Sequence, residues 1–333
     1  MNIFLFLFVV NFILLLFYKK FSKIINIYDY PDGKRKLHSQ KTPLLGGFFL
    51  GINILIFCIF KIFNFTYIEI SSVFFVDDIQ IVIFFVFSFL IFLIGILDDK
   101  IEIRANTKFI LLFVTILILV NIENDLVIKS IKLSFFQKEI FLLNFSKPFT
   151  ILCFLLFINA CNMFDGINLQ LPFYALLTVT SYLFIIDFLD FFLFFLMFPL
   201  VTISALNFKG KIFMGDSGSL LIAFVLSYLS IKLYNLSYIQ NSDSIFLFMM
   251  IPGIDMLRLF FQRLLNKKNP FLPDRKHLHH LISDALNTTL TQVIVFSLLL
   301  VPPLMFFFEM PNILTVNIVL LVYIILLFYF KKI

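Results

Sequence analysis

The sequence is short of charge and has no tryptophan. Only 14% of its 333 residues are charged, whereas 61% are hydrophobic; water-soluble domains have roughly 25% charged and 45–50% apolar residues. A soluble chain of this length would need a polar surface, so the apolar excess cannot all be a buried core. The scarcity of charge therefore excludes a soluble globular protein and makes the lipid bilayer the expected solvent. The lack of tryptophan beside 51 phenylalanines is compositional drift and predicts no function.

Cysteine is scarce as well. Cys58, Cys153 and Cys161 lie within or at the ends of apolar runs, and an odd number without paired or metal-type spacing argues against a disulfide framework. They are expected to be small buried hydrophobic residues. The sequence also lacks an internal repeat and any loop long enough for a soluble domain, so residues 1–333 are predicted to form a single transmembrane domain.

Long apolar runs dominate the chain instead. A membrane-spanning helix needs about 20 mostly apolar residues, and about eleven runs come near that length. The first run is not an obvious secretory signal, because its positive charges follow the apolar stretch and no small-residue cleavage site is apparent. The expected fold class is an all-α polytopic membrane protein. The predicted spans are 2–18, 43–64, 79–97, 106–122, 149–162, 171–187, 190–207, 217–234, 245–264, 291–308 and 313–330.

The basic residues assign the two faces of the membrane. Lysine and arginine collect on the cytoplasmic side of membrane proteins, and most of the 26 in this chain follow spans one, three, seven and nine or close the sequence. This pattern predicts that the N-terminus lies outside and the C-terminus in the cytoplasm. Topology thus accounts for the net charge of +6, and no nucleic-acid partner is expected.

One segment between spans four and five departs from the helical pattern. In residues 126–147, apolar side chains such as Ile128, Ile131 and Leu133 stand among polar ones with a partly two-residue period. This period is typical of a half-buried strand. We expect a small β-hairpin on the external face.

Polar residues that the membrane does not explain gather at the predicted cytoplasmic ends of the spans, where ionisable groups are costly. Asp98 and Asp99 end span three. Adjacent carboxylates repel each other unless a cation neutralises them, and Mg²⁺ usually takes one or two carboxylates together with substrate phosphates. A solvated helix end beside Lys100 is the alternative.

A second polar group ends span five. Asn159, Asn162 and Asp165 are spaced by three residues and precede Gly166, so the two amides share one helix face and the carboxylate flanks it. The amides suit the hydrogen-bonding edge of a sugar or a uracil, and the carboxylate can join a metal site. Alternatively, these residues only cap and end the helix.

A glycine-rich turn opens span eight. Asp216 lies at or near the expected N-cap, between Gly215 and Gly218, with the hydroxyls of Ser217 and Ser219 beside it. A helix N-terminus presents free N–H groups and the positive end of the helix dipole, which favour a phosphate. A capping aspartate with nothing bound is the alternative, and the spacing excludes a Walker-type phosphate loop.

Histidines gather in the loop that is expected after span nine. His277, His279 and His280 stand beside Asp274 and Arg275. A zinc site is disfavoured, because two of the histidines are adjacent and no remote ligand is evident. Arginine offers a forked donor for phosphoryl oxygens, so contact with phosphates is the preferred interpretation.

The segment 29–47, between spans one and two, carries a basic cluster that includes Lys41. Basic residues at the inner leaflet can be topology signals or contacts with lipid headgroups. Gly47 and Gly51 are expected to form a close helix-packing face.

Taken in order, these motifs resemble those of a known family. Pro43 with Gly46 and Gly47, then LDD, NxxNxxDG, FMGDSGS and PFLPDRKHLHH, are similar to the polyprenyl-phosphate N-acetylhexosamine-1-phosphate transferases of glycosyltransferase family 4. The resemblance covers about residues 29–282. The His-x-His-His order and the count of eleven spans resemble the branch that includes WecA, not the branch that includes MraY.

The resemblance implies transfer of an N-acetylamino-sugar-1-phosphate, such as GlcNAc-1-phosphate, from a UDP-sugar to undecaprenyl phosphate, with release of UMP. It implies an active site on the cytoplasmic face of a bacterial inner membrane and a requirement for Mg²⁺, with Mn²⁺ as a substitute, and it leaves a homodimer open. The implied catalytic residues are Asp98, Asp99, Asp165, His279 and His280; the implied substrate-binding residues are Asn159, Asn162, Asn168, Asp274, Arg275, His277 and Lys41; the implied metal ligands are Asp216 and Asp99.

Charge suggests a mechanism for such a transfer. Both substrates are anionic, so Mg²⁺ on Asp216 would bridge the pyrophosphate and neutralise the charge that develops on departing UMP. The lipid phosphate is already a nucleophile near neutral pH. Asp98 is expected to take up its last proton, and Asp99 to support the metal. A covalent aspartyl intermediate stays open.

One position departs from the family pattern, which usually reads DGxDG. Here Asn168 replaces the second aspartate and Leu169 the second glycine, so an altered activity, or a binding or scaffold role, is an alternative function. A secondary transporter is another alternative. It is disfavoured because transporters place their binding groups near the bilayer midplane and often show paired repeats.

Overall fold

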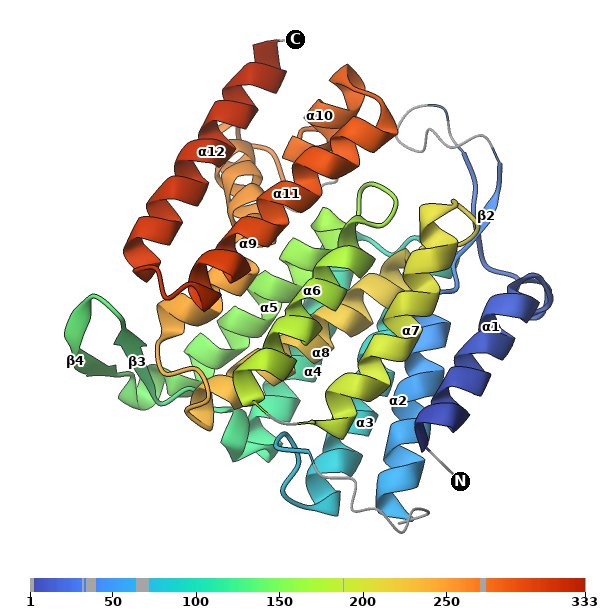
Figure 1. The fold of residues 1–333 in the computed structure, drawn as a ribbon, viewed down its shortest axis with the longest axis horizontal. Coiled ribbons are helices and arrows are strands. Elements are labelled where there is room, and N and C mark those ends of the chain that lie inside the picture. Colours follow the sequence, from blue (N-terminus) through green and yellow to red (C-terminus); the bar gives the residue numbers. More distant parts are fainter. Residues whose placement is uncertain are drawn as a thin grey trace.

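A computed structural model describes residues 3–31, 33, 40–63, 72–187, 189–269 and 274–332. The middle of the basic segment 29–47 and the first part of the histidine segment, residues 270–273, lie outside this description. Most of the helices lie roughly side by side in a bundle, and a β-hairpin projects from one end of it (Figure 1).

The described residues form twelve α-helices, most of them apolar along their whole length. Their bounds are α1 (Ile3–Ile25), α2 (Gly46–Ile62), α3 (Asp78–Ile101), α4 (Ala105–Ile122), α5 (Ser146–Phe164), α6 (Gln170–Ile186), α7 (Phe191–Phe208), α8 (Gly215–Asn235), α9 (Ser242–Leu265), α10 (Leu278–Ala285), α11 (Thr288–Phe307) and α12 (Asn312–Lys332).

The long helices confirm that the chain is an all-α, multi-pass membrane protein. In the described part of the chain, nine helices are long and apolar enough to cross a membrane, and α2 and α6 are shorter apolar helices. Each of the eleven predicted spans coincides with one of these helices. The count of eleven crossings and the outward N-terminus stay predictions.

Two strand pairs interrupt the helices. The predicted hairpin is confirmed: β3 (Ser130–Leu133) pairs antiparallel with β4 (Phe136–Phe141). Two short 3-10 turns flank it, η1 (Asn124–Leu126) and η2 (Leu143–Phe145). A second antiparallel pair, β1 (Tyr28–Asp29) with β2 (Thr42–Pro43), lies between α1 and α2 and was not predicted.

Helix α8 forms the centre of the bundle, because 94% of the residues in its most apolar stretch are buried. It packs against α2, α3 and α5. Glycines permit the closest approaches, because a Cβ added at Gly95 of α3 would lie 2.3 Å from the Cα of Ser217, and one at Gly47 of α2 would lie 2.6 Å from the Ser217 carbonyl carbon. The expected packing role of Gly47 is confirmed, whereas Gly51 makes only ordinary contact with Phe92.

The start of α8 is also held by backbone pairing. The amide of Phe213 donates to the Pro43 carbonyl, and the Phe213 carbonyl accepts from the amides of Leu45 and Gly46. The turn that carries Gly215 and Asp216 is therefore fastened to the start of α2. This brings segments about 170 residues apart together at one end of the bundle.

Candidate active site

Asp99, at the end of α3, caps the first turn of α8. Its Oδ1 accepts the Asp216 amide at 2.7 Å and its Oδ2 accepts the Ser217 amide at 3.0 Å. Gly215 has φ +70, and a Cβ there would lie 2.8 Å from Asp99 Oδ2, so the turn requires glycine. Asp216 lies near the N-cap, as expected, in the first turn of α8, but Asp99 and not Asp216 caps the helix. Two of the N–H groups expected to bind phosphate are satisfied by Asp99 instead.

Lys108 holds two of the predicted carboxylates together. Its Nζ lies 2.6 Å from Asp98 Oδ2 and 2.8 Å from Asp216 Oδ1. Asn162, on α5, donates from Nδ2 to the same Asp216 oxygen at 2.5 Å and to Ser219 Oγ at 2.9 Å. Side chains from α3, α4, α5 and α8 thus converge on Asp216.

Asp165 follows the last residue of α5 and completes this group, which we call the aspartate cluster (Asp98, Asp99, Asp165 and Asp216). Burial raises the pKa of Asp165 to about 7, and repulsion from Asp216 and Asp99 adds to the rise. A carboxyl with this pKa can hold or release a proton near neutral pH.

A second network fixes the start of the histidine segment. Asp255, inside α9, receives four hydrogen bonds: at Oδ2 from His277 Nδ1 (2.7 Å), and at Oδ1 from Tyr323 Oη (2.6 Å), Arg258 Nη2 (2.8 Å) and the Leu278 amide (3.2 Å). Arg258 also donates to Tyr323 Oη and to the Lys276 carbonyl. We call Asp255, Arg258, His277 and Tyr323 the histidine-anchoring network.

His279 and His280 lie on α10, not in a loop as expected. This helix has only eight residues, with His, Ser and Asp among them, so its apolar signal is too weak for a sequence window to detect. His279 is buried and neither ring nitrogen has a hydrogen-bond partner among the described residues; the same holds for Nδ1 of His280. Burial lowers the pKa of His280 to about 4 and, with repulsion from His280 and His277, holds that of His279 well below its usual range. Both rings are therefore neutral at physiological pH.

The end of α5 lies between the aspartate cluster and the histidines of α10. A Cβ added at Gly166 would lie 1.9 Å from His279 Nε2, so only glycine lets the ring approach this closely. The Phe164 ring also meets the His279 ring edge-on, with centroids 5.9 Å apart. Asp165, between these two residues, therefore connects the aspartate cluster with the histidines.

Other predicted residues have partners outside this junction. Asn159 Nδ2 donates to the Leu155 carbonyl of its own helix, and Lys41 Nζ lies over the Tyr28 ring. Asn168 lies on the turn between α5 and α6, where its carbonyl accepts from Gln292. Asp274 pairs with Arg263 at 3.0 Å, and Arg275 pairs with Asp284 at 2.5 Å.

The donor set suits a divalent cation that is shared with a substrate. Among the described residues, no three His, Cys, Asp or Glu side chains form a ready-made metal cage. However, Mg²⁺ usually takes one or two protein carboxylates and completes its shell with water and phosphate. Asp98 and Asp216 already hold one cation between them, the ammonium of Lys108, so their oxygens are placed to bind positive charge.

Four residues of these two networks were not predicted as site residues. Lys108 was counted only as a topology signal, and Tyr323 gave no signal because tyrosine is ordinary at the edge of a membrane span. Asp255 and Arg258 did give one: two charges three residues apart inside an apolar helix are costly unless they are paired or functional.

Comparisons with known proteins show which family this chain resembles. The family model described as glycosyl transferase family 4 matches residues 81–234, a range that includes all four clustered aspartates and Lys108. The chain is therefore similar to glycosyl transferase family 4 over this central part.

Several curated members of the family are similar over most of the chain. An undecaprenyl-phosphate alpha-N-acetylglucosaminyl 1-phosphate transferase of Thermotoga maritima is 28% identical over 87% of this chain and 84% of its own length. The enzyme of the same name in Escherichia coli is 27% identical, over 81% and 73%. A probable undecaprenyl-phosphate N-acetylglucosaminyl 1-phosphate transferase of Bacillus subtilis is 25% identical, over 79% and 71%.

Proposed function

We propose that this chain is a member of glycosyl transferase family 4 and transfers an N-acetylamino-sugar-1-phosphate, with GlcNAc-1-phosphate as the leading candidate, from a UDP-sugar to undecaprenyl phosphate. UMP is released, and the lipid-linked product begins the synthesis of a cell-surface glycan. The names of the relatives in Thermotoga maritima and Escherichia coli support this reaction class.

The observation that carries the proposal is the aspartate cluster with Lys108 between two of its members. Both substrates bring negative charge, so the site must supply cations and proton acceptors instead of a serine or cysteine nucleophile. The Lys108 ammonium, 2.6 Å and 2.8 Å from two carboxylates, is the resident cation. A residue network that holds charge in place before substrate arrives is what electrostatic catalysis requires.

In the proposed reaction, an oxygen of the lipid phosphate attacks the phosphorus that carries the sugar. A new P–O bond forms there, the pyrophosphate P–O bond breaks, and UMP leaves with the bond's electron pair. Asp98 or Asp165 would take up the last proton of the lipid phosphate. Asp99 orients Asp216 by binding the amides of Asp216 and Ser217.

Asp216 would hold Mg²⁺, or Mn²⁺ in its place, together with substrate phosphates. The ion would supply charge neutralisation and alignment of the phosphoryl groups. Asn162 steadies the Asp216 carboxylate through its amide. Asp99 therefore supports the metal site through the backbone of the α8 turn, while its own oxygens stay on the two amides.

His279 and His280 are proposed to act as neutral hydrogen-bond donors to phosphate or sugar oxygens. Both ring nitrogens of His279 and Nδ1 of His280 have no partner among the described residues, and the pKa values of both rings lie below neutrality. Arg275 and Asp274 are proposed to bind substrate only after exchanging their present ion-pair partners. Asn159, Asn168 and Lys41 remain proposed substrate contacts.

We place the site on the cytoplasmic face of a bacterial inner membrane, because UDP-sugars are cytoplasmic and most basic residues lie at that end of the helices. The direct test uses radiolabelled UDP-GlcNAc with undecaprenyl phosphate in membranes that contain the protein. Lipid-linked radioactivity together with UMP is the expected result. Binding of the substrates without turnover would favour the scaffold alternative raised by Asn168. If the protein neither binds nor turns over the substrates, transport is the remaining alternative.

A panel of UDP-N-acetylamino sugars in the same assay identifies the donor. The polymer that follows could be an O-antigen, a capsule or a wall teichoic acid, and the glycan that is lost from cells lacking this protein would identify it. A homodimer is a further proposal, tested by the mass of the purified protein in detergent.

A further inference from the structure

The hairpin end of the bundle contains two adjoining cavities at the membrane boundary opposite to the aspartate cluster. Helix α4 carries Lys108, which binds Asp98 and Asp216 of the cluster, in its first turn and ends at Ile122, just before Asn124 in the cavity wall. Its 18 residues span about 27 Å at 1.5 Å per residue, close to the thickness of the hydrocarbon core. Groups beyond Ile122 therefore lie near the far headgroup region.

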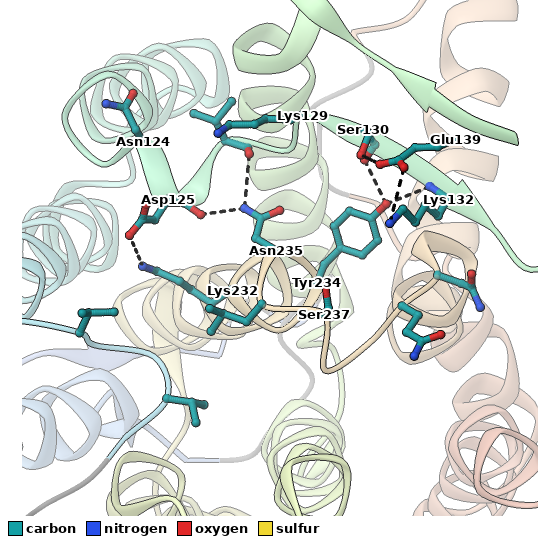
Figure 2. Close-up of a pocket in the computed structure, with 16 residues that line it drawn as sticks. Asn124, Asp125, Lys129, Ser130, Lys132, Glu139, Lys232, Tyr234, Asn235 and Ser237 are labelled. Carbon is teal, nitrogen blue, oxygen red and sulfur yellow. Dashed lines mark hydrogen bonds and ion pairs between the residues drawn. The ribbon is translucent and has the colours of Figure 1, made fainter.

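The first cavity, of about 670 Å³, is shown in Figure 2. Its polar side chains mostly bind one another. Lys232, only 3% exposed, lies 2.8 Å from Glu123, and Lys132 lies 3.6 Å from Glu139. Asn235 donates to the Asp125 carbonyl. A wall of mixed charge that is paired within itself indicates no class of ligand.

The second cavity, of about 790 Å³, is different in charge. Asn124 and Lys129, both labelled in Figure 2, line the two cavities alike. The second cavity adds Lys147, and no acidic side chain is among the described residues that line it. Lys147 also donates to Asn121 Oδ1 at 2.9 Å, which holds its ammonium beside the end of α4. The wall therefore has a net positive charge.

The same wall has a strongly apolar part. Phe141 and Leu143 line it and are 66% and 80% exposed. Leu143 leads through η2 directly into α5, where Leu152 and Leu156 are also exposed. The apolar surface thus runs from the cavity along a membrane-spanning helix. Water is a poor solvent for such a surface, whereas a lipid tail is a good one.

We propose that the groove lined by Lys129, Lys147, Phe141 and Leu143 binds an anionic phospholipid of the membrane leaflet at the hairpin end. The headgroup phosphate would lie between the two lysines, and an acyl chain would follow Leu143 onto α5. Charge complementarity identifies the headgroup, and the continuous apolar path identifies the tail. This lipid would hold the hairpin against the bundle, far from the reacting groups.

The absence of tryptophan from the chain provides a clean reporter. Phe141→Trp places one fluorophore in the groove, and short-chain phosphatidylglycerol is titrated into the detergent-solubilised protein. We expect a saturable change in emission. Phosphatidylcholine of the same chain length and inorganic phosphate should each bind at least ten-fold more weakly, because each supplies only half of the recognised chemistry.

Charge variants in the Phe141→Trp background test the lysines. A lysine near an anionic headgroup contributes about 1 kcal/mol, so Lys129→Ala and Lys147→Ala should each weaken binding about five-fold. Lys138→Ala is the matched control, since Lys138 is on the same hairpin but lines neither cavity. Equal effects of all three variants, or equal binding of phosphatidylcholine, would show a non-specific apolar surface and overturn the proposal. Equal binding of inorganic phosphate would overturn the lipid assignment.

Native mass spectrometry of the unaltered chain provides a second measurement that does not depend on the new tryptophan. Retention of one phosphatidylglycerol that is lost in the Lys129→Ala/Lys147→Ala protein supports the site. Equal retention by the two proteins contradicts it.

Discussion

Lys108 and Asp216 form a 2.8 Å ion pair between α4 and the first turn of α8. The two residues are 108 positions apart in the chain, and the same ammonium also binds Asp98. The lysine therefore balances the charge of a cluster that would otherwise repel itself. Removing it should harm both the geometry of Asp216 and the attraction for anionic substrates.

The first prediction concerns this lysine. Lys108→Gln keeps much of the side-chain length but removes the charge, so turnover should fall at least about 100-fold, as for the loss of one preorganised stabilising group. The measurement is kcat with both substrates saturating. Lys100→Gln, an exposed lysine at the end of α3, is the control and should stay within about two-fold of the unaltered protein. Comparable losses in the two variants would contradict the assignment.

The second prediction concerns the metal. Asp216→Asn keeps the size of the side chain but removes the charge that Mg²⁺ needs, so turnover should be abolished while the protein stays folded. EDTA should do the same to the unaltered protein, and added Mg²⁺ should restore it. Asp125→Asn, an acid-to-amide change at the opposite end of the bundle, should remain active. Full activity in EDTA, or full activity of Asp216→Asn, would contradict the assignment of Asp216 as a metal ligand.

Much of the fold could be predicted from the sequence because the bilayer is the solvent. A bilayer demands about 20 apolar residues per crossing, which is why hydropathy located the helices, and the two-residue period of residues 126–147 located the hairpin. Gly47 was correctly expected to permit close packing. These features depend on local sequence, so a single chain is enough to predict them.

The pairings within the site could not be predicted in the same way, because they depend on how helices pack. Spacing placed Asn159 and Asn162 on one face, yet Asn159 binds its own backbone and only Asn162 reaches Asp216. Arg275 was expected to be available for phosphate, but Asp284, nine residues later, pairs with it. A one-dimensional pattern identifies polar residues that need a partner, and only the fold selects the partner.

The third prediction concerns the histidine-anchoring network. Tyr323→Phe removes a hydroxyl that donates to Asp255 at 2.6 Å and accepts from Arg258 at 2.7 Å. One such hydrogen bond to a charged group is worth about 1.5–3 kcal/mol. Without this bond Asp255 should hold the start of α10 less firmly, so that His279 and His280 are misplaced. We therefore expect kcat to fall about five- to ten-fold while KM for either substrate changes little.

The assay for Tyr323→Phe is run well below the unfolding temperature, so that lost stability does not imitate lost positioning. Tyr329→Phe, on the same helix but 61% exposed, is the matched control and should have unchanged kcat. A lower melting temperature with full kcat would show that Tyr323 is only structural.

The fourth prediction concerns orientation. Asn241 precedes α9 at the hairpin end, and Asn269 follows α9 at the other end. In a chain from which the three native cysteines have been removed, an impermeant thiol reagent applied to whole cells should label Asn241→Cys and not Asn269→Cys. Cell lysis should make both reactive. The reverse pattern would place the aspartate cluster outside and remove its access to UDP-sugars.

The fifth prediction concerns pH and stability. Burial lowers the pKa of His280 to about 4 in the folded protein, against about 6.5 in an unfolded chain. Between these values the unfolded chain binds more protons, so the free energy of unfolding falls as pH falls from 6.5 to 4. Above pH 6.5 both states are neutral and this contribution is fully present.

His280→Gln removes this titration and leaves that of His279, which has the same sign. The melting temperature of the variant should therefore fall less steeply than that of the unaltered protein as pH falls from 6.5 to 4. Asp165 acts oppositely, because a raised folded pKa of about 7 makes its contribution decline as pH rises from 4 to 7. For this reason the test is the difference between the two proteins, measured in detergent at each pH, since the Asp165 contribution is common to both. Parallel melting curves across the window would show that His280 is not held neutral by burial.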